Sequence, residues 1–163
     1  MKVSFDKIED AFLISSEEIS NWVDRKTGKV IFIGSESVFG EAFYDDDDEA
    51  QAAHEIMILC GEIENAENIE IDENRYVCIS PPHSGENFKV MEEFTLEFAD
   101  EKIQPELISA LQGRKPFRSF KDVLLDYPDE REKWFAFEAK KLREFIEDWA
   151  ESEQIEIDFD NEK

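Results

Sequence analysis

Basic side chains alternate with phenylalanines in one short segment, and this pattern is suited to binding an anion. The cations are Arg114, Lys115, Arg118 and Lys121, and Phe117 and Phe120 lie among them. Proteins that bind nucleic acid use such interleaving, because the cations contact phosphate and the rings stack on bases. These four basic residues, called the basic tract below, are therefore the candidate binding residues of the sequence.

The same phenylalanines also have a structural interpretation. Phe117, Phe120, Leu124 and Tyr127 follow one another at steps of three, four and three residues, which is the spacing of one helix face. In that case the rings belong to the core, and the cations pair with nearby carboxylates. We favour the core interpretation and keep anion binding open.

Metal coordination is the second chemistry that the sequence invites, through the acidic run at residues 45–49. A calcium-binding EF-hand loop that began at the first of these aspartates would need glycine at its sixth position and glutamate at its twelfth. The chain has Ala50 and Ile56 there. His54 and the glutamate after it open like a metalloprotease signature, but Ile58 stands where the second histidine belongs. We therefore expect no metal site and no cofactor.

Nucleophilic catalysis finds no support in the order of the residues. Neither a GxSxG motif nor a glycine-rich phosphate loop occurs, and Cys60, Cys78 and His83 show no paired spacing. Two carboxylates could act as general acid and base, but a chain with 42 acidic residues offers many pairs and singles out none. We identify no catalytic residue. A hydrolase that uses dispersed carboxylates and a divalent ion stays an alternative.

The formal net charge of −24 is unevenly distributed along the chain. Residues 113–143 hold nine basic and six acidic side chains, a net charge of +3, so the remainder carries −27. A charge of this size keeps molecules apart in solution, and it also offers an anionic surface to a basic partner. Direct nucleic-acid binding is disfavoured, because phosphate would meet repulsion almost everywhere outside the basic tract.

Hydrophobic periodicity predicts the elements that hold these residues. In the first half we expect a helix over 4–13, a hairpin over 21–33 with Gly28 in its turn, and a strand over 75–79. Residues 34–49 have the composition of a mobile acidic loop, and a helix over 50–63 follows it. The first half therefore supplies a small sheet and its flanking helices.

The second half has the pattern of consecutive helices over 84–98, 105–111, 117–127 and 128–149, and alternation at 155–159 allows a last strand. The last helix has a stripe of residues that we expect to be mostly buried. They are Trp134, Phe135, Leu142, Phe145, Ile146 and Trp149. The predicted fold is α+β, with a small antiparallel sheet, made by the N-terminal hairpin and the central strand, packed against a C-terminal helical layer. We expect a single domain over residues 1–163 with a frayed acidic C-terminus.

Two features predict the cellular compartment. No apolar run is long enough to span a bilayer, and the first residues lack the apolar centre of a signal peptide. Cys60 and Cys78 are then expected as reduced thiols. The sequence thus predicts a cytoplasmic protein that does not associate with membranes, and it leaves the oligomeric state open.

Several stretches together resemble a known protein family. They are Gly113–Arg114, Phe117–Arg118, Phe120–Lys121–Asp122, Tyr127–Pro128 and Trp134–Phe135–Ala136–Phe137, with weaker likeness at Val23–Asp24, Thr27–Gly28, Tyr76–Val77 and Met91–Glu92–Glu93–Phe94. The stretches from Gly113 onward resemble the C-terminal signature of the bacterial Uncharacterised Protein Family 0158, and the earlier stretches are similar to other parts of that family. Lys115 and Pro116 depart from the small residues that the family tends to carry there. The resemblance implies one compact bacterial domain and assigns no activity, substrate or site.

The function that the residues favour is protein binding. We expect a non-enzymatic binding or regulatory domain that recognises a protein partner through charged surface, and the acidity is compatible with a basic partner. One alternative is an acidic mimic that occupies a nucleic-acid-binding protein. Charge alone slightly favours the acidic surface over the basic tract as the interface.

Overall fold

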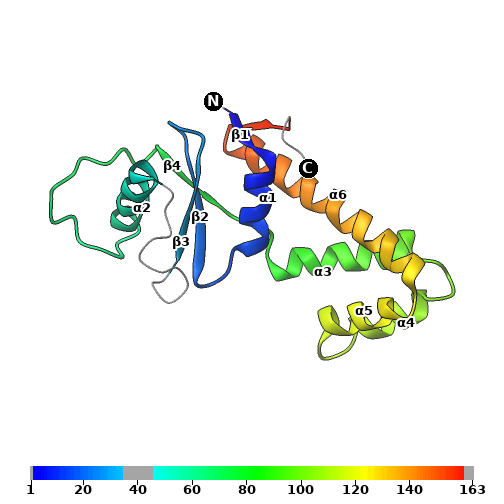
Figure 1. The fold of residues 1–163 in the computed structure, drawn as a ribbon. Helices are drawn as coiled ribbons and strands as arrows, with labels where there is room; N and C mark the ends of the chain where they lie inside the picture. The colour runs from blue at the N-terminus through cyan, green and yellow to red at the C-terminus, as the bar shows by residue number, and fades with distance from the viewer. Residues whose placement is uncertain (1, 35–45, 160–163) are drawn as a thin grey trace. The chain divides into compact units, whose positions relative to one another are not determined.

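The computed structural model describes residues 2–34 and 46–159 (Figure 1). Contacts along the chain divide it into two compact units, one formed by Met1–Pro81 with Ile146–Lys163 and the other by Pro82–Phe145. Both helices and strands are present, so the predicted α+β class is confirmed. Organisation as one domain stays a prediction.

The first unit contains a three-stranded antiparallel sheet in the order β3-β2-β4. The strands are β2 (Ile19–Asp24), β3 (Val30–Gly34) and β4 (Tyr76–Ile79), as the predicted hairpin and central strand require. Gly28 has a φ of 76° in the hairpin turn, a conformation that costs a glycine little. Its N–H donates to the carbonyl of Asp24 at 2.8 Å, which closes the turn.

A helix covers each face of this sheet (Figure 1). Trp22 lies opposite Ile31 in the register, and this face packs on α2 (Asp47–Leu59) through Ile56. The other face carries Asn21, whose side-chain amide donates to the carbonyl of Ala11 in α1 (Phe5–Ile14) at 2.9 Å. Alternation of side chains along a strand thus gives each helix its own apolar surface.

The acidic run begins a helix rather than ending a loop. We expected α2 to start at residue 50, but its first turn is Asp47, Asp48 and Glu49. Asp46 is the N-cap, and its Oδ1 accepts from the backbone N–H of Glu49 at 2.9 Å. Carboxylates are favoured there because the first turn of a helix has unpaired N–H groups and a positive end. The other residues of the expected mobile loop, 35–45, lie outside the described residues.

A parallel pair of short strands completes the first unit. β1 (Lys2–Ser4) pairs with β5 (Glu156–Asp158), with Val3 opposite Ile157. The last strand agrees with the predicted alternation. The helix was expected to begin at Ser4 and no strand was expected before it, and β1 forms there because its partner comes from residues 156–158.

The second unit is a group of helices around an aromatic core. Its elements are α3 (Ser84–Glu93), the π-helix η1 (Phe94–Phe98), α4 (Gln104–Leu111), α5 (Pro116–Leu125) and the first part of α6 (Pro128–Ser152). Phe94, Phe120 and Trp134 meet in the core with ring centroids 4.9 to 6.3 Å apart. Pro128 begins α6 as predicted, because proline suits the first turn of a helix.

The buried stripe of α6 differs from the predicted one. Trp134, Ile146 and Trp149 are buried as expected, and Phe145 and Leu142 are partly buried. The prediction that Phe135 is buried is wrong, because its side chain is 49% exposed. Phe137 is buried instead. Trp134 and Phe135 are adjacent on the helix and point about 100° apart, so Phe135 points away from the core when Trp134 faces it. The apolar spacing of the sequence is compatible with either residue on the buried face, and packing in the core places Trp134 there.

The π-helix explains a second departure. We expected one helix over 84–98 with Phe98 on its buried face, but Phe98 is 50% exposed. A π-turn winds more residues per turn than an α-helix, so it rotates the positions that follow. Gln104 Nε2 donates to the carbonyls of Thr95 at 2.9 Å and Leu96 at 3.3 Å, which stabilises this turn.

Among residues 2–34 and 46–159, no helix has the length and apolar character needed to cross a bilayer.

Candidate binding surface

The basic tract lies at the start of α5 in the second unit. Lys115 is the N-cap of α5 and Arg114 precedes it, while Arg118 and Lys121 lie on the helix one turn apart. All four side chains are exposed. Within the described residues, the ion pairs of the tract are confined to Arg118, which pairs with Asp122 at 3.7 Å in a solvent-exposed contact. The tract is therefore open to a partner.

The two phenylalanines of the tract have different environments. Phe120 is fully buried, and Leu124 beside it is 1% exposed, so for these two the core interpretation is confirmed. Phe117 was predicted on the same buried face, but it is 39% exposed and contacts only the edge of the core through the ring of Phe88. Tyr127 is half-buried, and its hydroxyl donates to Glu106 Oε1 at 2.7 Å. The prediction of one continuous core stripe is thus wrong at Phe117.

A hollow of about 290 Å³ adjoins the tract between α5 and α6. Its lining includes Lys121, Asp122, Leu125, Arg131, Trp134 and Phe135. Leu125 and Phe135 are 58% and 49% exposed, which is unusual for large apolar side chains that line the same hollow. Two cations and two exposed apolar groups therefore share one concave site.

The charges around this hollow are mixed. The guanidinium carbon of Arg131 lies 5.2 Å from the ring centroid of Phe135, within the range of a cation–π contact. Asp122 also lines the hollow, so a carboxylate lies among its two cations. The basic tract together with Phe117, Leu125, Arg131 and Phe135 is called the basic–apolar surface below.

Sequence reasoning found the four tract residues but missed Leu125, Arg131 and Phe135. A signal for Leu125 was present: it follows Arg118 and Lys121 at steps of three and four, the spacing of one exposed face. Arg131 and Phe135 are four residues apart on α6, but only the packing of that helix on α5 brings them to the tract.

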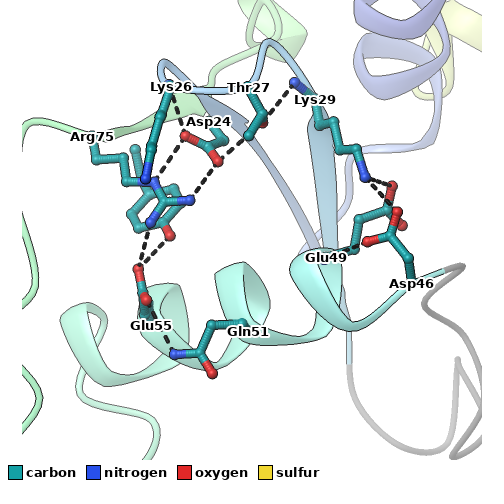
Figure 2. A network of polar contacts seen from close by, with 10 residues as sticks. Asp24, Lys26, Thr27, Lys29, Asp46, Glu49, Gln51, Glu55 and Arg75 are labelled. Carbon is teal, nitrogen blue, oxygen red and sulfur yellow. Dashed lines mark hydrogen bonds and ion pairs between the residues drawn. The ribbon is translucent and has the colours of Figure 1, made fainter.

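A polar network in the first unit is the other notable cluster (Figure 2). Arg75 donates to both carboxylate oxygens of Asp24, at 3.0 and 2.7 Å, and to Glu55 at 3.2 Å. The hydroxyl of Tyr76 also donates to Glu55. The network joins β2, β4 and α2, and each charge in it has a partner, so it serves to hold the sheet to its helix.

Burial and hydrogen bonding act in opposite directions on Asp24. Burial would raise the pKa of its carboxyl group, because water is excluded from the charge. Hydrogen bonds from Arg75, from the N–H of Lys26 and from the hydroxyl of Thr27 outweigh this effect and hold the pKa below its ordinary value. Asp24 is therefore a charged anchor of the hairpin.

The two thiols of the chain lie apart from any cluster of metal-ligating side chains among the described residues. The described part of the chain contains no group of three or more His, Cys, Asp or Glu side chains placed to hold a metal ion. Cys60 is exposed and Cys78 half-buried, and no disulfide joins them. Burial raises the pKa of both thiols.

Comparison with known proteins gives a family and no structural precedent. The sequence profile described as "Uncharacterised protein family (UPF0158)" matches residues 1–163. The chain is 27% identical over 156 residues to "UPF0158 protein PA5073" of Pseudomonas aeruginosa, an alignment that covers 96% of this chain and 86% of that protein. No solved structure matches the chain. The profile covers the whole sequence, and the chain therefore belongs to Uncharacterised protein family UPF0158.

Proposed function

We propose that this protein is a non-enzymatic, cytoplasmic binding domain that docks a protein partner on its basic–apolar surface. The observation that carries the proposal is the pair Leu125 and Phe135, which stay 58% and 49% exposed beside Lys121 and Arg131. Exposed apolar groups rimmed by polar ones are typical of interaction sites.

The composition of this surface favours a protein partner. The energetic centres of protein interfaces are rich in aromatic residues and arginine, because both bury a large area and arginine also donates several hydrogen bonds. Phe117, Phe135, Arg118 and Arg131 provide these types on two neighbouring helices of one unit. The acidic remainder of the chain offers a larger charge, but charge alone supplies no apolar anchor.

The acidic remainder still influences association. At physiological salt the Debye length is about 8 Å, so charges on more distant parts of the chain are largely screened at the contact itself. Local groups then determine the affinity, and the net charge of −24 mainly changes the rate of encounter.

Site-specific photo-crosslinking in living cells tests this proposal. A photoreactive phenylalanine analogue replaces Arg118, whose side chain is 77% exposed, and in a control strain it replaces Leu13, which is 67% exposed in the first unit. We expect a discrete protein adduct from position 118 that is absent from position 13. The adduct should disappear when Phe135→Ser is added and persist when Lys140→Gln is added. Equal adducts at both positions, or none at position 118, would contradict the proposal.

A further inference from the structure

We propose that the hollow between α5 and α6 anchors one apolar side chain of an acidic partner segment, with Lys121 and Arg131 pairing to carboxylates beside that anchor. This inference rests on the proposed function and names the chemistry of the partner. Three observations support it: the volume of the hollow, the exposed apolar side chains at its edge, and the hydrogen-bond donors in its lining.

The size of the hollow suits a side chain. Its volume of about 290 Å³ lies just below the range for pockets that hold whole small-molecule ligands, about 300–1,000 Å³. Leu124 and Trp134 are buried beneath it, and Leu125 and Phe135 stay exposed at its edge. Seating an apolar group there removes these two side chains from water, which favours binding.

The polar groups of the wall are mostly donors. Lysine and arginine donate hydrogen bonds and accept none. Trp134 is 2% exposed and contributes to the apolar part of the lining. Asp122 is the one acidic residue of the lining, and it already pairs with Arg118. A complementary partner therefore brings acceptors, and carboxylates add the opposite charge.

A protein segment fits these features better than a nucleic acid. A nucleic acid carries a continuous line of phosphates, about one charge per 1.7 Å of duplex, whereas the lining of the hollow provides two cations to pair with them. A short peptide places its few carboxylates only where the cations are.

Peptide binding to the full chain tests the inference. The probe is a short fluorescein-labelled peptide of Asp, Glu, Gly and Ser with one central Phe. Its two matched forms carry Ser in place of Phe, or Asn and Gln in place of the acids. Fluorescence anisotropy in about 0.15 M sodium chloride should show that the first peptide binds about tenfold more tightly than either matched form. Equal binding of the Ser form, preference for the uncharged form, or no binding would overturn the inference.

Nuclear magnetic resonance locates the bound peptide. The chain has three tryptophans, and we expect the indole N–H signal of Trp134 to shift while those of Trp22 and Trp149 do not. The double variant Lys121→Gln, Arg131→Gln should weaken binding about tenfold, while Lys140→Gln, which removes an exposed charge elsewhere on α6, should not. A shift at Trp22 or Trp149 instead, or displacement of the peptide by a single-stranded oligonucleotide of thymidine, would also overturn it.

The two proposals can fail separately. If position 118 gives a partner adduct but the peptide does not bind, the proposal of a protein interface at the basic–apolar surface stands. The proposal that the partner segment is acidic with one apolar anchor is then wrong. If position 118 gives no adduct while the peptide binds at Trp134 as expected, the hollow has the proposed selectivity and the cellular protein partner is wrong. Failure of both experiments refutes both.

Discussion

Arg75 holds Asp24 across the sheet with two parallel hydrogen bonds, Nε to Oδ1 at 3.0 Å and Nη2 to Oδ2 at 2.7 Å (Figure 2). Asp24 is 2% exposed, so its charge depends on partners within the protein. This geometry fixes the end of β2 against the start of β4.

Removing the guanidinium should therefore destabilise the fold. We expect Arg75→Gln to lower the free energy of unfolding by about 1.5–3 kcal/mol, the range for hydrogen bonds to a charged group. The matched Arg118→Gln breaks an exposed pair and should cost less than about 1 kcal/mol. Urea denaturation of the variants checks this. Equal losses from the two variants would mean that Asp24 does not depend on Arg75.

The same contact predicts a pH dependence. The pKa of Asp24 in the folded protein is below its ordinary value of 3.8, so the unfolded chain binds the proton first as the pH falls. The stability from this group is therefore complete above the ordinary value and is lost as the pH falls through the lower, folded value. The difference in unfolding free energy between the wild type and Asp24→Asn should shrink in that range. A difference that is constant from neutral pH downward would contradict the assignment.

The phase of α6 can be tested with two adjacent aromatics. Trp134 is 2% exposed and Phe135 is 49% exposed. Trp134→Ala should lower the free energy of unfolding by about 3–5 kcal/mol, because it leaves a cavity in the core. Phe135→Ala should change it by no more than about 1 kcal/mol. Denaturation midpoints decide the question, and a larger loss from Phe135→Ala would restore the phase that the sequence suggested.

The end of α6 offers a stabilising substitution. Gln154 has a φ of 57°, and the N–H of Ile155 donates to the carbonyl of Ala150 at 2.8 Å, which is the helix-ending motif that favours glycine at this place. Gln154→Gly should raise the free energy of unfolding by about 1 kcal/mol, because the left-handed conformation is costly for residues with a Cβ atom. Gln154→Ala keeps that cost and is the control. A gain from the alanine variant equal to that from glycine would refute the explanation.

Salt should stabilise the protein. A chain with a net charge of −24 repels itself, and added ions screen this repulsion. We expect the melting temperature to be higher in about 0.5 M than in about 0.02 M sodium chloride. A lower value at the higher concentration would show that favourable ion pairs outweigh the repulsion.

The sequence predicted those features that depend on neighbours along the chain. Gly28 marked the hairpin turn, Pro128 marked the start of α6, and the steps from Phe120 to Leu124 gave the buried face of α5. Each of these signals is local, because a backbone preference or a helical period acts within a few residues. The family resemblance was also correct.

Features that depend on distant partners were missed. Trp134 and Phe135 fit the helical period equally well, and only contact with Phe94 and Phe120 decides which ring is buried. The hollow beside the tract forms where α5 and α6 meet, so spacing within either helix could not reveal it. The acidic residues at 46–49 were predicted to lie in a loop, because like charges repel one another. They begin α2 instead, because the positive end of a helix favours carboxylates.

The pairing of β1 with β5 has a consequence for protein synthesis. Lys2–Ser4 leaves the ribosome early, but its partner Glu156–Asp158 is made last among the described elements. Until then the backbone N–H and C=O groups of β1 that face β5 have only water as a partner, so the first unit stays incomplete until β5 has left the ribosome. A nascent chain stalled before Glu156 should therefore be more sensitive to protease at its N-terminus than the released protein.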